Sequence, residues 1–321
     1  MVSSDSFLEA WIAGPYGTNF YTRTFKAASP SAALVFMHGA AEHCGRYTEF
    51  HRRFSSQHNI TVFTFDLRGF GQTALHPTQR SATSAYGKTD WESQLNDVEW
   101  ALKYTRTEFP ELPVFLMGAG MGGGIILGLL CDLERRNNPF VLGLSGVIAS
   151  APCITPTTPP SCAVVWLASV IARLAPYTLY PGRNKPEQLS RNTETNAAYA
   201  VDPFVMSPGS VRSILDTLTA GQRVLDESYV HWPEITPVLF LHGEEDPINS
   251  FKSTFHLYSK INARDKKLIA YPATTLSFQG AYSELQNEPD GVKEKYVMDV
   301  VEFVHGRAVH VDGSRRRRGC N

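Results

Sequence analysis

Short apolar runs alternate along the chain with longer stretches in which apolar residues recur at helical spacing. The runs are rich in Val, Ile, Leu and Phe, which predicts strands buried on both faces of a parallel sheet. In one helical stretch, Leu95, Val98 and Leu102 are spaced along one face. We expect strands at residues 32–37, 61–66, 114–117, 144–150, 237–243 and 267–271, and helices at 46–57, 91–109 and 291–304. This alternation predicts an α/β fold with a doubly wound, mostly parallel sheet.

The alternation is interrupted after residue 151. A proline-rich stretch precedes an apolar segment at 163–174, and a polar stretch follows at 181–202. The apolar segment is hydrophobic around nearly its whole circumference, so it should either pack into the core or line an entrance. We expect an inserted helical cap at residues 152–232, which divides one core into residues 1–151 and 233–307, and a disordered basic tail at residues 308–321.

Residues 115–125 are the stretch around which the chain is organised, because an apolar strand runs there into a glycine turn and then into an apolar helix. Elbows of this kind carry the nucleophilic serine of G-x-S-x-G hydrolases on a strained turn, with an oxyanion hole beside it. The central residue here is Gly120, which has no side chain.

Composition narrows the classes of partner. The 321 residues are 43% hydrophobic, enough for one large core, and the formal net charge is −1, which gives no field that attracts nucleic acid. The five cysteines are odd in number and scattered, so neither a disulfide framework nor a metal site is indicated, and we expect no cofactor. The chain begins without a basic and apolar leader, and its apolar run at 162–172 is about half of what a bilayer requires. We therefore expect a cytoplasmic protein without a transmembrane segment.

Four blocks of sequence resemble the monoacylglycerol lipase group of the α/β-hydrolases, also called the serine aminopeptidase S33 or hydrolase-4 type. Residues 38–47 resemble the family pattern H-G-x-x-E-H-x-G-R-Y, and residues 241–246 resemble L-H-G-x-x-D. Residues 118–123 resemble G-H-S-M-G-G except at Ala119 and Gly120. Residues 280–289 resemble G-x-Y-H-E-L-x-N-E-P, with Ser283 where the family has its catalytic histidine. The resemblance implies an α/β-hydrolase fold with an inserted helical cap.

The resemblance also implies roles for single residues. Asp246 stands at the acid position, and the backbone N–H groups of Ala40 and Met121 stand where the oxyanion hole would be. Gly120 and Ser283 remove the nucleophile and the base, because glycine cannot form an acyl-enzyme and a serine hydroxyl is not basic near neutral pH. Several positions, including Ala119 and Gln286, depart from the pattern together, which favours natural divergence over a single inactivating substitution.

Two interpretations of Asp246 stay open. It could move protons, with help from Ser283 or His43, or it could be a structural carboxylate bonded to Ser283 or to loop amides. The other candidate residues also have a purely structural interpretation. Glu42 and His43 could only shape the loop, and the cysteines could be inert small hydrophobic residues. We expect a pocket lined by Glu42, Cys44, Ala119, Cys153, Trp166 and Tyr282.

Three functions compete. The first is a non-hydrolytic enzyme, such as an isomerase, cyclase or lyase, that acts on a small lipophilic metabolite under the cap. The second is a non-catalytic protein that binds a lipid or a partner. The third is a lipase-like or esterase-like hydrolase with an unconventional nucleophile, such as activated water or Cys44. In each, the partner is a small lipophilic molecule, and transient contact of the cap with a membrane surface is compatible with the sequence.

Overall fold

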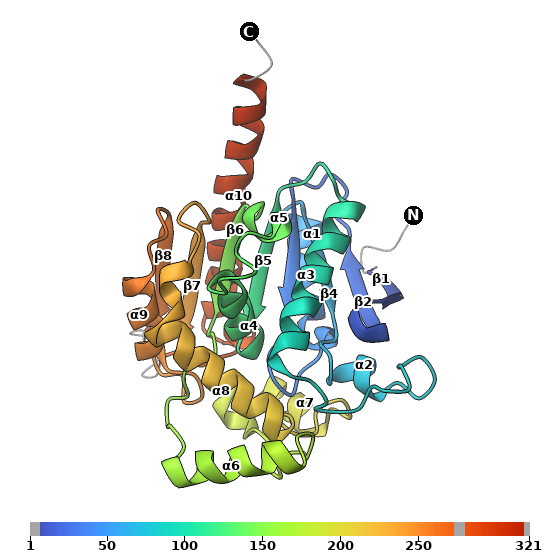
Figure 1. Ribbon diagram of the computed structural model, residues 1–321. Helices are drawn as coiled ribbons and strands as arrows, with labels where there is room; N and C mark the ends of the chain where they lie inside the picture. The colour runs from blue at the N-terminus through green and yellow to red at the C-terminus, as the bar shows by residue number, and fades with distance from the viewer. Residues whose placement is uncertain (1–6, 273–279, 318–321) are drawn as a thin grey trace.

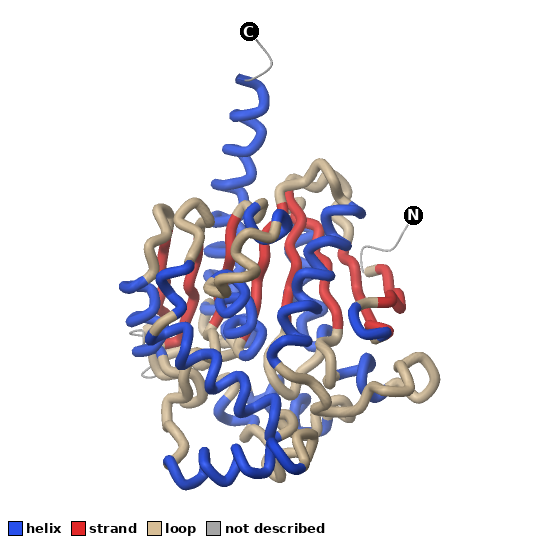
Figure 2. Tube along the Cα trace, viewed as in Figure 1, coloured by secondary structure: helices blue, strands red, loops and turns tan. Residues whose placement is uncertain are grey.

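One mixed sheet between two layers of helices forms the body of the molecule (Figures 1 and 2). A computed structural model describes residues 7–272 and 280–317, with the backbone alone for residues 309–317. In this part of the chain, eight strands are ordered β1-β2-β4-β3-β5-β6-β7-β8. The pairs β1·β2 and β2·β4 are antiparallel, and all other neighbours are parallel. The strand order reverses between β3 and β5, where open α/β sheets place their ligands.

The elements follow one another in βα alternation after an antiparallel start. The strands are β1 (Leu8–Ala13), β2 (Asn19–Phe25), β3 (Ala32–Met37), β4 (Ile60–Phe65), β5 (Val114–Ala119), β6 (Gly146–Ser150), β7 (Val238–Gly243) and β8 (Lys266–Tyr271). The α-helices are α1 (Thr48–Gln57), α2 (Gly71–Leu75), α3 (Trp91–Glu108), α4 (Met121–Leu130), α5 (Pro139–Leu142), α6 (Cys162–Leu174), α7 (Thr193–Val201), α8 (Val211–Asp226), α9 (Phe251–Lys260) and α10 (Val292–Arg317). Short 3-10 helices are η1 (Pro15–Gly17), η2 (Cys44–Tyr47), η3 (Pro186–Gln188), η4 (Ser228–His231) and η5 (Leu285–Asn287).

The predicted parallel strands are confirmed as β3 to β8, with ends that differ by up to two residues from the expected ones. Every residue of β3, β4, β5 and β7 is buried, which is why these strands appear as apolar runs. The core has two halves, one on each face of the sheet. Helices α3, α4, α9 and the end of α8 pack on one face, and α1 and α10 pack on the other.

The segment 152–232 lies between β6 and β7 and contains α6, α7 and α8. Helix α8 contacts α4, and α6 lies on the outer side of α8 at one end of the molecule (Figure 1). Only Ala172 of α6 is buried, so this apolar helix does not pack into the core. It lines the side of a groove instead.

Helix α10 begins at Val292 and continues to Arg317, beyond the body of the molecule in Figure 1. The backbone of residues 308–317 is therefore helical, and residues 318–321 of the expected disordered tail lie outside the described residues. None of the helices in the described ranges is both long and apolar enough to cross a membrane.

Candidate functional site

The expected elbow lies between β5 and α4, at the carboxyl end of the sheet. Gly120 has φ 52° and ψ −117°, a conformation that L-residues adopt only with strain. Its N–H donates to the carbonyl of Ser150 and its own carbonyl accepts from Cys153 N–H, at 3.0 and 2.8 Å. A Cβ added at Gly120 would find its nearest atom, Gly39 Cα, at 3.7 Å, so the space for a side chain is open. The elbow backbone is thus formed around a residue that has no side chain to present.

Helix α4 packs closely against the loop after β3, and this brings the backbone N–H groups of Ala40 and Met121 to the elbow. A Cβ at Gly122 would lie only 2.5 Å from the Met37 carbonyl oxygen, so the approach requires glycine there. Ala41 holds a left-handed φ of 56° in the same loop. Within the described residues, the N–H groups of Ala40 and Met121 have no acceptor in the protein. Met121 is also the first residue of α4, where the helix dipole favours a partial negative charge.

Asp246 is engaged on both carboxylate oxygens. Its Oδ1 accepts from the backbone N–H groups of Ile248 and Asn249 at 2.8 and 2.9 Å, and from Ser283 Oγ at 3.2 Å. Its Oδ2 lies 3.2 Å from Nε2 of the fully buried His242, whose Nδ1 contacts Thr254 Oγ1. These contacts match the structural alternative for Asp246, a carboxylate bonded to Ser283 and loop amides.

Besides Asp246, four expected site residues do not line the cavity beside the elbow, as far as the structure describes its wall. His43 turns away and places its Nε2 2.8 Å from Asp202 Oδ2, at the end of α7. Cys44 is buried with its N–H on Asp66, and burial raises the pKa of its thiol well above the usual range. Trp166 is 69% exposed on the outer side of α6, and Tyr282 lies beside Glu288. The expected pocket residues Cys44, Trp166 and Tyr282 thus lie outside the part of the cavity wall that the structure describes.

A cavity of about 230 Å³ lies at the elbow, under α8. Its wall includes the expected residues Ala40, Glu42, Ala119, Gly120, Met121, Cys153 and Ser283. Burial raises the pKa of the Cys153 thiol to about 12, so this thiol is not a ready nucleophile. Sequence reasoning missed other residues of the wall, among them Tyr47, Glu284 and four residues of α8, namely Ser213, Ile214, Thr217 and Leu218. Helical spacing in residues 211–226 could have revealed α8.

A second, almost entirely apolar groove of about 450 Å³ lies beside the cavity, between α6 and α8. The two spaces share Pro208, Ile214 and Leu218 in their walls. From α6, Val164, Leu167 and Ile171 face the groove. The site is therefore polar at the elbow and apolar toward α6.

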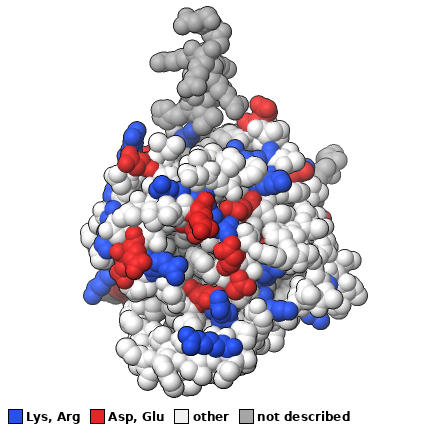
Figure 3. All heavy atoms as spheres, in the orientation of Figure 1, with Lys and Arg blue, Asp and Glu red and all other residues white. Residues whose placement is uncertain are grey.

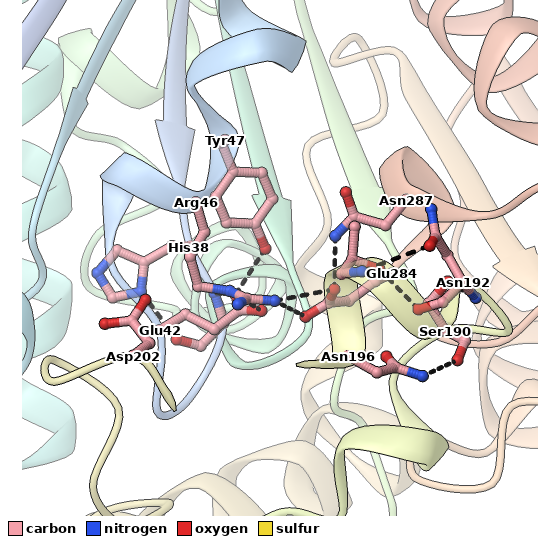
Figure 4. Close-up of polar contacts among 12 residues, drawn as sticks. His38, Glu42, Arg46, Tyr47, Ser190, Asn192, Asn196, Asp202, Glu284 and Asn287 are labelled. Carbon is pink, nitrogen blue, oxygen red and sulfur yellow. Dashed lines mark hydrogen bonds and ion pairs between the residues drawn. The ribbon is translucent and has the colours of Figure 1, made fainter. Parts of the chain in front are cut away.

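The polar end of the cavity holds a cluster of charged side chains (Figure 4). Arg46 donates through Nη2 to both oxygens of Glu284, at 2.7 and 3.0 Å. Glu42 Oε2 accepts from Tyr47 Oη and from the backbone N–H of Gly39, at 2.6 and 2.9 Å. Arg46 and Glu284 thus meet beside the loop that follows β3, although they lie 238 positions apart in the sequence.

A model of the family described as "Serine aminopeptidase, S33" matches residues 28–289. The chain belongs to the serine aminopeptidase S33 family. It is 28% identical to the monoglyceride lipase of Rattus norvegicus over 302 residues, which cover 93% of this chain and 90% of the relative. The monoacylglycerol lipase of Mycolicibacterium smegmatis is 27% identical over 277 residues, which cover 85% and 87%. A solved soluble variant of the Saccharomyces cerevisiae monoglyceride lipase has the same fold, with a TM-score of 0.79 at 22% identity over 94% of this chain and 95% of that one.

Among the described residues that line the cavity, none is a histidine, and Ser283 contacts a carboxylate rather than an imidazole. The described residues also contain no group of three or more His, Cys, Asp or Glu side chains placed to hold a metal ion.

Proposed function

We propose that this S33-family chain binds a neutral, monoacylglycerol-like lipid in the elbow cavity and does not cleave it by serine chemistry. The observation that carries the proposal is the elbow itself. Its two free backbone N–H groups, from Ala40 and Met121, face a space that a nucleophile would fill and that Gly120 leaves open. A carbonyl oxygen can accept from such a donor pair without covalent attachment.

The shape of the site supports a ligand with one polar and one apolar end. An ester or glycerol-like end would lie near the elbow and Glu42, and an acyl chain would follow the groove between α6 and α8. The lipase names of the relatives support the same substrate class for the binding step.

Binding is tested with 1-monooleoylglycerol and its non-hydrolysable ether analogue. At a ligand concentration of 100 times Kd, the free energy of unfolding should rise by about 2.7 kcal/mol. Ile214→Trp, which narrows both spaces, should weaken binding, whereas Ile235→Trp at an exposed position should not. Equal binding by the two variants, or no stabilisation of the parent chain, would contradict the proposal.

Ester hydrolysis is the second candidate, and the relatives named as monoglyceride lipases favour it. Water would have to be the nucleophile in the space at Gly120, because Cys44 lies outside the cavity wall and the Cys153 thiol is held protonated. Release of oleate from the ester ligand, at a rate unchanged in Cys153→Ala, would support this candidate over the binding protein.

Non-hydrolytic acid–base chemistry has less support than we expected from the sequence. Asp246 and His43 are engaged by Ser283 and Asp202, and neither lines the cavity. Product analysis on bound lipids is the measurement that separates such an enzyme from a binding protein.

We also infer that α6 is the part of the chain that meets a lipid surface. Trp166 and Leu174 are 69% and 82% exposed, and Arg173 is the only charged residue of the helix. The end of the molecule where α6 lies is mostly uncharged in Figure 3. Because α6 also borders the apolar groove, a lipid leaving a membrane there would have a short path into the site.

A further inference from the structure

Two carboxyl groups and one guanidinium are packed together at the polar end of the cavity. Arg46 is committed to Glu284 through the two bonds from its Nη2, and Asn287 Nδ2 donates to Glu284 Oε2 at 2.6 Å. Arg46 Nε lies 3.7 Å from Glu42 Oε1, too far for a hydrogen bond, and makes no other bond. If both carboxyl groups were ionised, the buried cluster would hold one uncompensated negative charge.

Glu42 differs from Glu284 in having an oxygen that no donor reaches. Tyr47 Oη and Gly39 N–H both donate to Oε2, so Oε1 is the atom that can carry a proton. The residue is only 5% exposed, yet it contributes to the cavity wall beside Gly39 and Ala40. Glu42 therefore borders the same cavity as the Ala40 and Met121 N–H groups of the elbow.

Electrostatics favours the neutral form of Glu42. Burial raises the pKa of Glu42 to about 8, and the Glu284 carboxylate adds to the rise through its charge and through a hydrogen bond between the two carboxyl groups. The charge of Arg46 and the hydrogen bond from Tyr47 oppose the rise. Arg46 holds the pKa of Glu284 below its ordinary value, although burial acts against this. The other titratable groups that face Glu42 are Tyr47 of η2 and Tyr199 of α7, and burial raises the pKa of both hydroxyls.

We propose that Glu42 is a neutral carboxylic acid in the resting protein and donates a hydrogen bond that orients an acceptor oxygen of the ligand beside the Ala40 and Met121 N–H groups. A carboxylic acid kept neutral by an apolar site serves as a donor of this kind in other proteins. This proposal rests on the proposed lipid-binding function and refines its ligand class. The site takes an uncharged ester, ketone or alcohol, and it rejects a fatty-acid anion because a further negative charge would lie beside Glu284.

The pH profile of binding tests the proposal with the ether analogue of 1-monooleoylglycerol. For the parent chain, Kd should be constant from pH 6 to 7.5 and should then rise toward about tenfold for each pH unit above 8, as Glu42 loses its proton. Glu42→Gln keeps a neutral donor, so its Kd should stay within about threefold of the parent value at pH 7 and remain flat to pH 9.5. Glu49→Gln, an exposed change on α1, should keep the parent profile.

Three outcomes would count against Glu42. A parent Kd that does not change with pH, a Glu42→Gln variant that binds more than tenfold more weakly at pH 7, or oleate binding as tight as the ether would each overturn the proposal.

A measurement on the ligand-free protein separates failure of the Glu42 proposal from failure of the proposed function. The infrared C=O band of a protonated carboxylic acid should be present at pH 7, vanish above pH 9 and be missing in Glu42→Gln. The band without any lipid binding would refute the proposed function, and lipid binding without the band would refute the role of Glu42 alone.

Discussion

At the scale of one residue, Gly120 holds a backbone conformation that an L-residue would adopt only with strain. A left-handed φ costs an L-residue about 1–2 kcal/mol, and glycine avoids most of this cost. The residue therefore relieves strain at the elbow while the space and the two donors around it remain.

Replacing Gly120 by serine and Ser283 by histidine should restore ester cleavage. A histidine at position 283 would lie beside Asp246, which already contacts the Ser283 hydroxyl, and could then take a proton from the new serine. The double variant should hydrolyse a short-chain nitrophenyl ester at least about 100-fold faster than either single variant, because triad members act as a unit. Equal rates in all three variants would show that the remaining elbow geometry is not that of a hydrolase.

The same strain predicts a stability effect that does not depend on activity. Gly120→Ala adds only a methyl group and meets no close atom, so any destabilisation, expected at about 1–2 kcal/mol, comes from the backbone. It is therefore the control for the stability of the serine variants.

Single-residue roles were predictable where they follow from position along the chain. The contact of Asp246 with Ser283 and the free N–H groups of the elbow follow from the sequence blocks and from strand ends. The Glu42 and Glu284 cluster does not, because its members come from loops far apart and their protonation depends on burial. Trp166 was placed wrongly, since a helix that is apolar all round does not reveal which side faces outward.

At the scale of elements, helix α6 is notable for the large apolar side chains that it leaves exposed. It contacts α8 but exposes large apolar side chains on its other side. Exposed apolar side chains gathered on one element are typical of an interaction site rather than of a core helix. The near-zero net charge means that any attachment to a membrane would be driven by apolar burial.

The double variant Trp166→Ser with Leu174→Ser should weaken attachment to neutral phosphatidylcholine vesicles by tenfold or more. Each large apolar side chain contributes roughly 1.5–3 kcal/mol when fully buried. Thermal stability should not change, because both side chains are exposed in the folded protein. Flotation of the vesicles measures bound protein, and Ile235→Ser, at a position 65% exposed outside α6, is the matched control. Equal flotation of parent and double variant would remove α6 from the lipid-facing surface.

The strands that could be predicted from the sequence are mainly those whose burial requires a run of apolar residues. Strands β3 to β7 lie inside the sheet and show as apolar runs, and the edge strand β8 still has an apolar run at 268–271 although it is only partly buried. Strands β1 and β2 were missed because polar residues interrupt them and most of β1 is exposed, so neither forms a run. Helix α8 was missed although its apolar residues have helical spacing, and this omission hid one wall of the cavity.

At the scale of the whole molecule, two buried histidines make the folding stability depend on pH. His38 is satisfied only as a neutral ring, because its Nδ1 contacts the Gly39 carbonyl while its Nε2 accepts from Leu67 N–H, at 2.8 and 2.9 Å. His51 lies between the rings of Phe36 and Tyr47, and neither of its nitrogens has a partner. Burial lowers the pKa of His38 to about 4 and that of His51 to about 3.

These shifts predict that folding stability falls in acid. Below the unfolded pKa of about 6.5, the unfolded chain binds protons that the folded chain excludes, so stability decreases as pH falls toward the folded values. For each proton that only the unfolded chain binds, the free energy of unfolding falls by about 1.4 kcal/mol for every pH unit of acidification. Between pH 6.5 and 4.5, urea unfolding should therefore show a loss about 2–3 kcal/mol smaller for His51→Phe than for the parent chain. A packing effect of the new ring is the same at both pH values and cancels, and the exposed His256→Gln should follow the parent. Parallel losses in His51→Phe and the parent would mean that His51 gains its proton without unfolding the protein.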